Sequence, residues 1–324
     1  MAKMTLQVRD LCTSFFTDKG EIKAVNNVSF DVPKRSIIGI VGESGCGKSM
    51  TARSVMRLLK YPGKIVSGSI VITGKELTTL TEAEMSNVRG EEISMIFQEP
   101  MTSLNPVMKV GKQVREVVLL HRKVTKKEAK AEVIRMFEKV GISEPEKRYE
   151  CYPHELSGGL RQRVMIAMAM ICRPKLLIAD EPTTALDVTV EAQILELMKN
   201  LREEIGTSII LISHNLGVVA EICDYVYVMY AGKVVEQAET FELFDNPQHP
   251  YTVGLMNAVE SLEKKSPVLD TIPGTVPNLL SLPAGCSFAP RCPYYTEECS
   301  LCNAELHEVS KGHLVRCHRA KGEV

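Results

Sequence analysis

The chain has 324 residues, of which 44% are hydrophobic, enough to bury the core of one large domain with an appendage or of two modest domains. Its 39 Lys and Arg against 40 Asp and Glu give a formal charge of −1, which provides no basic surface for nucleic acid. The longest apolar run (164–172) is too short to span a membrane and the N-terminus has no apolar signal core, so a globular cytosolic protein is expected.

Residues 5–35 alternate between apolar and polar and are rich in β-branched side chains. A turn at 18–20 divides this stretch, so an antiparallel hairpin is expected. Phe15 and Phe16 lie just before the turn, where an aromatic ring could stack on a base. Aromatic residues in strands most often belong to an ordinary core, and the pattern alone favours that interpretation.

The stretch Gly42-Glu43-Ser44-Gly45-Cys46-Gly47-Lys48-Ser49 fits G-x-x-x-x-G-K-[ST]. An apolar run (37–41) precedes it as a buried strand should, and a helix is expected over 50–60. In such a loop, glycines aim backbone N–H groups at a polyphosphate, Lys48 reaches the β- and γ-phosphates, and Ser49 gives its hydroxyl to Mg²⁺. A glycine-rich turn without a ligand is the alternative, which the intact ending and flanking elements disfavour. The chain is therefore expected to bind a nucleoside triphosphate.

Two short strands (68–72 and 93–97) follow, separated by a helix that begins near Thr81, and Gln98 ends the second strand. Residues 106 to about 172 are almost wholly helical in pattern. Thr125 to Glu128 reads as a capping box, and Gly141 stops the helix that follows it. The sequence predicts a helical insertion within an α/β core.

The α/β pattern resumes with an apolar strand (175–181) that ends in Asp180 and Glu181. Open α/β sheets bind ligands at the carboxyl ends of their strands. Asp180 could hold Mg²⁺ through water and Glu181 could polarise the attacking water of a hydrolysis reaction. A helix from Asp187 and a strand (208–213) ending at His214 follow. A solvated acidic strand end and a structural histidine are the plain alternatives.

The stretch Leu156-Ser157-Gly158-Gly159-Leu160-Arg161-Gln162-Arg163 resembles the signature of ATP-binding-cassette ATPases. The order of phosphate loop, Gln98, signature, Asp180-Glu181, Ala185-Leu186-Asp187 and His214 resembles this family over about residues 5–245. The resemblance implies a RecA-like P-loop α/β core with an N-terminal antiparallel β subdomain and an inserted helical subdomain at about 99–172. A small cysteine-rich extension at 246–324 would follow the nucleotide-binding domain of residues 1–245.

The resemblance also implies a mechanism in which two cassettes sandwich two ATP molecules. Ser157, Gly158 and Gly159 would contact the γ-phosphate across the interface, and Glu181 would act as the base. His214 would sense the γ-phosphate, Gln98 would touch Mg²⁺ and the attacking water, and Phe16 would stack on adenine. The remaining ATP-binding positions implied are Gly42, Ser44, Gly45, Cys46, Gly47, Lys48, Ser49, Met50 and Asp187, with Ser49, Gln98 and Asp180 around Mg²⁺.

The tail resembles the C-terminal extension of dipeptide and oligopeptide importer ATPases in three stretches: 249–252, 272–277 and 282–293. In that branch the subunit pairs with a second, non-identical ATPase and two membrane permeases, fed by an extracytoplasmic peptide-binding protein. The chain would then be peripheral on the cytoplasmic face of the membrane. Two departures are Leu160, where many cassettes have Gln, and Asn215, where the family more often has Asp.

Five of the ten cysteines crowd into the last 40 residues, and four have the spacing C-x₅-C-x₆-C-x₁₇-C: Cys286, Cys292, Cys299 and Cys317. This spacing fits neither tight ferredoxin patterns nor paired C-x₂-C zinc ribbons, and thiolates suit an iron–sulfur cluster or zinc equally. The resemblance favours [4Fe–4S]. Possible substitutes as ligands, above all for Cys299, are Cys302, His307, His313 and His318. Free thiols in a loose tail are the remaining alternative.

A soluble cassette protein acting in DNA repair or translation is the competing function. Such proteins usually carry two cassettes in one chain or a long coiled-coil insertion, and this sequence has neither. The transport ATPase is therefore the expected function.

Overall fold

A computed structural model describes residues 3–98, 103–184, 186–263, 272–301 and 304–320. The chain divides into two compact units, each built from separate stretches of sequence. Unit 1 comprises residues 1–5, 33–36 and 79–210; unit 2 comprises 6–32, 37–78 and 211–324. The predicted domain division at residue 245 stays a prediction. No helix in the described ranges combines the length and apolarity needed to span a bilayer.

Unit 2 contains the predicted antiparallel hairpin, with strands β1 (Met4–Thr17) and β2 (Gly20–Pro33). They belong to a four-stranded sheet of order β2-β1-β4-β5, completed by β4 (Gly63–Ile72) and β5 (Lys75–Glu76). The pairing of β1 with β4 places Leu6 opposite Ile72. Both side chains are fully buried, so the alternating pattern of the sequence gives this sheet its apolar face.

A second sheet of unit 2 begins with β3 (Ile37–Val41), every residue of which is buried. β3 pairs in parallel with β9 (Tyr225–Tyr230), and β10 (Lys233–Glu239) continues the sheet in antiparallel fashion. The C-terminal strands β12 (His313–Val315) and β11 (His307–Ser310) extend it further. A strand that is apolar along its whole length is typical of a parallel sheet covered on both faces, as the sequence predicted for β3.

Helix α1 (Lys48–Val55) is shorter than the predicted helix over 50–60. Arg57 adopts a left-handed conformation with φ of 51°. The N–H of Leu58 donates to the carbonyl oxygen of Arg53, and the N–H of Arg57 donates to that of Ser54. These two hydrogen bonds form a Schellman motif, in which the left-handed position is usually glycine. Because arginine occupies that position here, the sequence gives no signal for the end of the helix.

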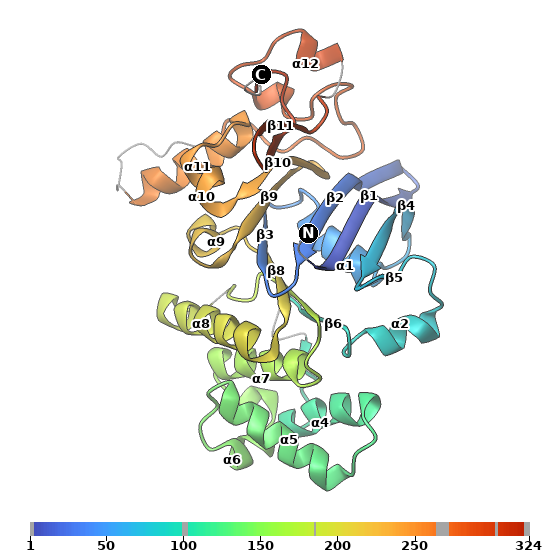
Figure 1. The fold of residues 1–324 in the computed structure, drawn as a ribbon, viewed down its shortest axis with the longest axis vertical. Helices are drawn as coiled ribbons and strands as arrows, with labels where there is room; N and C mark the ends of the chain where they lie inside the picture. The colour runs from blue at the N-terminus through green and yellow to red at the C-terminus, as the bar shows by residue number, and fades with distance from the viewer. Residues whose placement is uncertain (1–2, 99–102, 185, 264–271, 302–303, 321–324) are drawn as a thin grey trace. The chain divides into compact units, whose positions relative to one another are not determined.

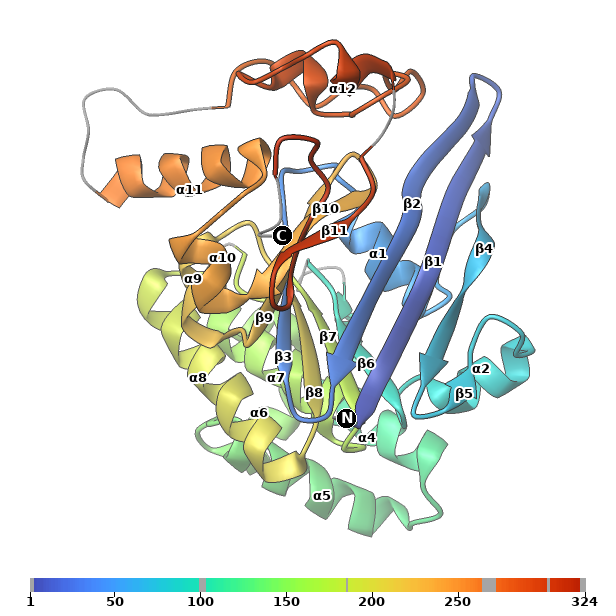
Figure 2. The same ribbon diagram turned by 45° about the horizontal axis from the view of Figure 1, so that its top comes forward.

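The remaining helices of unit 2 lie in its C-terminal half. They are α9 (Leu216–Ile222), α10 (Thr240–Asp245), α11 (Pro250–Glu263) and α12 (Glu298–Leu301), with a 3₁₀ turn η2 (Ala289–Arg291) between the last two. The helix α11 and the segment that carries α12 are labelled in Figure 2.

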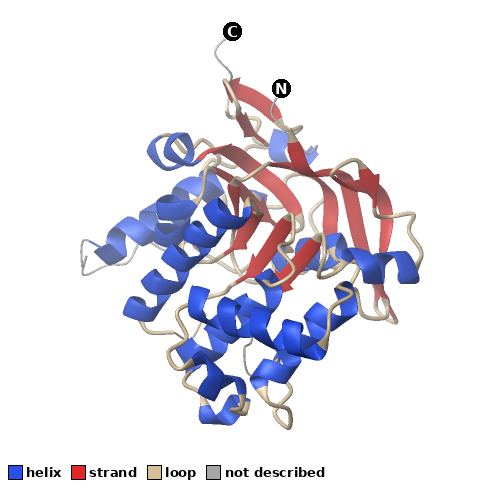
Figure 3. Ribbon diagram, turned by 60° about the horizontal axis from the view of Figure 1, so that its bottom comes forward, coloured by secondary structure: helices blue, strands red, loops and turns tan. Residues whose placement is uncertain are grey.

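Unit 1 contains the predicted helical insertion, which Figure 3 draws as helices and loops without strands. Its elements are α4 (Val110–His121), α5 (Lys126–Lys139), α6 (Pro145–Tyr149), η1 (Pro153–Glu155) and α7 (Gly158–Met170). The capping box before α5 is confirmed, because the N–H of Glu128 donates to Thr125 Oγ1 and the N–H of Thr125 donates to Glu128 Oε2. Gly141, with φ of 74°, follows the helix as predicted.

The α/β part of unit 1 has α2 (Glu82–Val88) after Thr81, and the parallel strands β6 (Ile93–Ile96) and β7 (Leu176–Asp180). They pair in the register that places Ile93 opposite Leu176. Helix α8 (Val188–Ile205) begins after Asp187, and β8 (Ser208–Ile212) contains the division between the units. The predicted α/β architecture, with its antiparallel sheet and helical region, is confirmed.

Candidate functional site

The glycine-rich loop of unit 2 connects β3 to α1 and closes around a buried lysine. Lys48 Nζ donates to the carbonyl oxygens of Gly42 at 2.6 Å and of Glu43 at 3.0 Å. Gly47 has φ of 109°, and a Cβ there would lie 2.5 Å from the carbonyl oxygen of Ala24, so only glycine fits. The loop therefore holds an ammonium group at the N-terminus of a helix, the arrangement that binds anions.

The side chains around this loop differ in what they can contribute. Ser49 and Met50 are half-buried in the first turn of α1, whereas Ser44 and Gly45 are exposed. Cys46 is fully buried and burial raises the pKa of its thiol, whose Sγ lies 3.8 Å from Lys48 Nζ. Sequence analysis named these positions from the motif, and the structure places them together within unit 2.

In unit 1 the carboxyl end of β7 carries the two predicted carboxylates. Asp180 is buried, whereas Glu181 is half-buried and has a left-handed backbone with φ of 49°. Gln98 Nε2, after β6, donates to Glu181 Oε2 at 2.7 Å, and Thr184 Oγ1 donates to the same oxygen at 3.0 Å. A bulky residue held in this conformation costs about 1–3 kcal/mol, and such strain concentrates at functional sites.

The structure thus unites Gln98 and Glu181, which lie 83 positions apart in the sequence. It adds Thr184, which sequence analysis did not name; its position three residues after Glu181 was the available signal. Ala185 lies outside the described residues, and Asp187 is the exposed N-cap of α8.

The signature stretch begins helix α7. Ser157 is its N-cap, and Ser157 Oγ accepts a hydrogen bond from the N–H of Leu160. Ser157 and Gly158 are exposed, and Gly159 packs closely, since a Cβ there would lie 3.0 Å from Val190 Cγ1. Residue 160 joins the cap through its backbone, so leucine in place of glutamine leaves the helix start intact.

His214 is exposed in unit 2, two residues after the end of β8, and Asn215 is the N-cap of α9. Asn215 Oδ1 accepts hydrogen bonds from the N–H groups of Gly217 at 3.1 Å and of Val218 at 3.4 Å. Asparagine is as good an N-cap as aspartate, which explains why this departure from the family pattern is compatible with the local fold.

Of the two aromatic candidates on β1, Phe16 is 44% exposed and Phe15 is half-buried. Phe15 packs against the next strand, where a Cβ on Gly63 would lie 2.6 Å from its ring. Lys64 Nζ lies 4.6 Å from the centroid of the Phe16 ring, a cation–π contact. Phe16 therefore has the more accessible ring of the pair.

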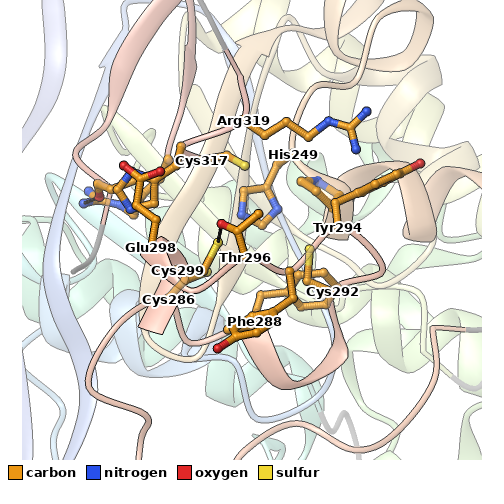
Figure 4. Close-up of a pocket in the computed structure, with 16 residues that line it drawn as sticks. His249, Cys286, Phe288, Cys292, Tyr294, Thr296, Glu298, Cys299, Cys317 and Arg319 are labelled. Carbon is orange, nitrogen blue, oxygen red and sulfur yellow. Dashed lines mark hydrogen bonds and ion pairs between the residues drawn. The ribbon is translucent and has the colours of Figure 1, made fainter. Parts of the chain in front are cut away.

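The four spaced cysteines line one cavity of about 400 Å³ in unit 2, into which their side chains project (Figure 4). Burial raises the pKa of the Cys286 and Cys292 thiols. The Cys286 N–H donates to the Cys299 carbonyl oxygen at 2.7 Å, and Thr296 Oγ1 lies 3.4 Å from Cys299 Sγ. Among the described residues, however, no three Cys, His, Asp or Glu side chains form a group that could hold a metal ion.

Two of the substitute ligands are engaged elsewhere. His307 Nε2 contacts the carbonyl oxygen of Ala320 at 2.6 Å. His313 is fully buried, with its Nε2 2.7 Å from Glu236 Oε1 and its Nδ1 3.2 Å from Glu242 Oε1. His318 lines the cavity, and Cys302 lies outside the described residues. His318 Nδ1 itself lies 3.8 Å from Glu298 Oε1, and the ligand set stays a prediction.

Comparison with known proteins agrees with this geometry. Residues 25–184 match the family described as ABC transporter, and residues 235–299 match the C-terminal region of oligopeptide/dipeptide transporters. The chain is 52% identical to the oligopeptide transport ATP-binding protein OppD of Salmonella typhimurium, over 100% of this chain and 96% of the relative. It is 50% identical to the dipeptide transport ATP-binding protein DppD of Bacillus subtilis, over 96% of this chain and 93% of the relative.

Among solved structures, the dimeric bacterial ABC transporter cassette MJ0796 superposes with a TM-score of 0.66 at 24% identity, covering 72% of this chain and 98% of the cassette. This likeness shows the fold, an α/β cassette core.

Proposed function

Because this chain belongs to the ATP-binding subunits of the oligopeptide and dipeptide transporters of the ABC family, we propose that its hydrolysis of ATP energises peptide uptake across the cytoplasmic membrane. The proposal rests on one observation: the same chain combines a phosphate loop around the buried Lys48 with a C-terminal region that matches peptide transporters. Reconstituted peptide uptake tests it. A soluble role in DNA repair or translation is disfavoured by that C-terminal region.

In the proposed site, ATP binds with its β- and γ-phosphates against the phosphate loop. Phosphate oxygens replace the carbonyl oxygens of Gly42 and Glu43 as acceptors for Lys48, and the first N–H groups of α1 add further donors. Mg²⁺ would be held by the hydroxyl of Ser49, by Gln98 and, through water, by Asp180, because this ion prefers oxygen ligands and keeps several waters. Phe16 stacks on the adenine.

For hydrolysis, Glu181 accepts a proton from the water that attacks the γ-phosphorus, and ADP leaves as the bond to the β-phosphate oxygen breaks. Gln98 and Thr184 both donate to Glu181 Oε2, so the carboxylate is oriented by two neighbours. His214 contacts the γ-phosphate. The hydrogen bonds from Gln98 and Thr184 orient the carboxylate of Glu181, whose backbone is itself in the left-handed region.

We further propose that two cassettes form the working unit, with the exposed Ser157 and Gly158, together with Gly159, directed at the ATP of the partner cassette. The N-terminus of α7 would bind the γ-phosphate as the phosphate loop does, through backbone N–H groups. The MJ0796 cassette is described as dimeric. The proposed partner is a second, non-identical ATPase, and the pair joins two permeases fed by an extracytoplasmic peptide-binding protein. The chain is then peripheral at the cytoplasmic face.

The segment after Gln98 is proposed to relay the nucleotide state to the permeases, since Gln98 contacts the site. Residues 99–102 lie outside the described part. Beyond them, Leu104 is buried, whereas Val107 is 82% exposed. Gln113 of α4 fixes this segment: its Nε2 donates to the carbonyl oxygens of Asn105 and Met108, and its Oε1 accepts from the N–H of Asn105.

Replacing Val107 with Asp is expected to uncouple the transporter, lowering peptide uptake about 10-fold while ATP hydrolysis by the isolated ATPase subunits stays unchanged. A charge would be buried against the permease, at a cost comparable to several kcal/mol. Leu120→Asp, at an exposed apolar position on α4, is the matched control. Uptake and hydrolysis measured in parallel check the prediction; normal uptake by the Val107 variant would place the relay elsewhere.

We also propose that the cysteine-lined cavity holds a soft-metal centre, of the [4Fe–4S] type, with zinc as the alternative. The donors fit the chemistry, since Cys286, Cys292, Cys299 and Cys317 face one cavity whose volume admits a small cluster. Ligation requires closer approach of the thiols than the present arrangement has. Such a centre would staple a segment rich in proline and glycine.

Protein purified without oxygen is expected to be brown, because thiolate-bound iron and sulfide absorb visible light and zinc, a d¹⁰ ion, does not. Changing Cys286, Cys292 or Cys317 to Ser should abolish the colour, whereas Cys151→Ser, in unit 1, should not. Iron, sulfide and zinc analysis accompanies the spectra. Colourless wild-type protein with one zinc per chain would replace the cluster by a zinc staple, and metal-free folded protein would refute both.

A further inference from the structure

The phosphate loop and the C-terminal segment are joined within unit 2 by a bidentate ion pair. Arg291 Nη1 donates to Glu43 Oε2 at 2.6 Å, and Arg291 Nη2 donates to Glu43 Oε1 at 3.0 Å. Glu43 is the second residue of the loop, and the two residues are 248 positions apart in the sequence. Arg–carboxylate pairs of this fork geometry are directional and stronger than single charged contacts.

This ion pair is part of the interior. The Arg291 side chain is only 4% exposed. Its Nε donates to the carbonyl oxygen of Pro273 at 2.8 Å and its Nη2 also donates to that of Ile272 at 3.3 Å. The guanidinium carbon lies 5.9 Å from the ring centroids of Tyr230 and Phe288. These contacts hold the Arg291 side chain in place independently of Glu43. The ion pair therefore ties the phosphate loop to a side chain that is itself well fixed.

The backbone of Glu43 is held as firmly as its side chain. Its N–H donates to the hydroxyl of Tyr251 at 2.7 Å, and its carbonyl oxygen accepts from Lys48 Nζ at 3.0 Å. Tyr251 is fully buried and packs on Tyr230, with ring centroids 4.7 Å apart. Glu43 thus connects the C-terminal segment directly to the lysine that binds phosphate.

The same arginine lies next to the cysteine-lined cavity. Arg291 ends the 3₁₀ turn η2, which Cys286 precedes by three residues and Cys292 follows at once. The N–H of Ala289 donates to the carbonyl oxygen of Cys286 at 3.0 Å, and the N–H of Cys292 donates to that of Ala289 at 3.2 Å. Phe288, which lines the cavity, also packs on Tyr230 and Tyr251. The Cys286 and Cys292 thiols and the Arg291 guanidinium therefore project from one short hydrogen-bonded segment.

We propose that Arg291 is a positioning residue that holds the phosphate loop through Glu43, and that it couples the cysteine-lined cavity to the affinity for ATP. The inference rests on the proposed function only in taking ATP as the ligand of the loop. Removal of Arg291 leaves the Glu43 carboxylate without its fork, and the loop then samples conformations that do not bind phosphate. Apparent affinity falls by the fraction of molecules that remain competent.

The test measures binding of a non-hydrolysable ATP analogue with Mg²⁺ to the full chain. Arg291→Met and Glu43→Gln are each expected to raise Kd about 10-fold, within the range typical of coupling between linked sites. The double variant should be no worse than either single variant, because both break one interaction. Arg291→Lys, which keeps the charge but not the fork, should fall between. Once ATP is saturating, the hydrolysis rate should change less than about twofold.

The control is Arg9→Met. Arg9 also pairs with a carboxylate in the same unit, but on the surface and through one nitrogen: Arg9 Nη2 donates to both oxygens of Asp31, at 2.7 and 2.9 Å. Its Kd for the analogue should equal that of the wild type. Thermal unfolding of every variant establishes that binding is measured on folded protein, and Glu43→Gln and Arg291→Lys serve if Arg291→Met does not fold.

The cavity is tested by Cys292→Ser, which should raise Kd in wild-type protein but not in the Arg291→Met background. Unchanged Kd in the Arg291 and Glu43 variants, or additive effects of the two, would overturn the positioning role. A Cys292→Ser effect that persists without Arg291 would overturn the coupling route. Failure of the wild type to bind the analogue would instead refute the proposed function, a different and separately visible outcome.

Discussion

Replacement of Glu181 with Gln is expected to lower the rate of ATP hydrolysis by at least about 100-fold, the lower end of what a general base contributes. Glutamine keeps the size of the side chain and can still accept hydrogen bonds from Gln98 and Thr184 through its amide oxygen. It cannot accept the proton of the attacking water. Binding of ATP and Mg²⁺ depends on other residues, so Kd for ATP should stay within about threefold of the wild-type value.

The measurement combines steady-state ATPase activity with size-exclusion chromatography in ATP and Mg²⁺. Because the bound ATP is not consumed, dimers of cassettes should accumulate in the Glu181→Gln variant. Glu82→Gln makes the same chemical exchange at an exposed carboxylate that pairs with Arg89, and it should behave as the wild type. Normal turnover by Glu181→Gln would remove this residue from the role of base.

Replacement of Lys48 with Met is expected to weaken ATP binding about 100-fold, close to 3 kcal/mol for losing a hydrogen bond to a charged group. Lys48 is almost completely buried, and methionine has similar length without the charge, so packing is preserved. Hydrolysis should fall at least as far. The phosphate loop would keep its backbone donors, but the cation that neutralises the β- and γ-phosphates would be gone.

Equilibrium binding of the ATP analogue measures this loss, with Lys147→Met as the matched control on the surface of the helical insertion. The control should bind as tightly as the wild type. Equal binding by Lys48→Met would show that the ligand of this loop is not a polyphosphate held by its lysine.

Much of the fold was predictable because the local signals agreed with the tertiary structure. The uniformly apolar strand before the phosphate loop, the Thr125–Glu128 capping box and Gly141 each specify an element through short-range physics. The end of α1 was predicted wrongly. The helix is followed by a left-handed residue, which is usually glycine but here is Arg57. The residues next to Arg57 in the sequence do not indicate that its backbone is left-handed.

The candidate site follows the same division. The phosphate loop was predictable from its motif, whereas the hydrogen bond between Gln98 and Glu181 became visible only in the structure. The link between Glu43 and Arg291 was not predictable either, because it joins positions 248 apart and neither residue belongs to a motif for an ion pair. Likewise His307 and His313 were reasonable ligand candidates by composition, and only their hydrogen bonds to Ala320 and Glu236 engage them elsewhere.

The most direct test of the account is peptide uptake by the ATPase reconstituted in liposomes with its permeases, partner ATPase and binding protein, with ATP supplied on the ATPase side. We expect labelled peptide to accumulate on the ATPase side of the membrane only with ATP and wild-type protein. With Glu181→Gln, we expect no accumulation above background. Sustained ATP hydrolysis by a complete wild-type complex without peptide movement, or equal uptake by the Glu181→Gln complex, would contradict it.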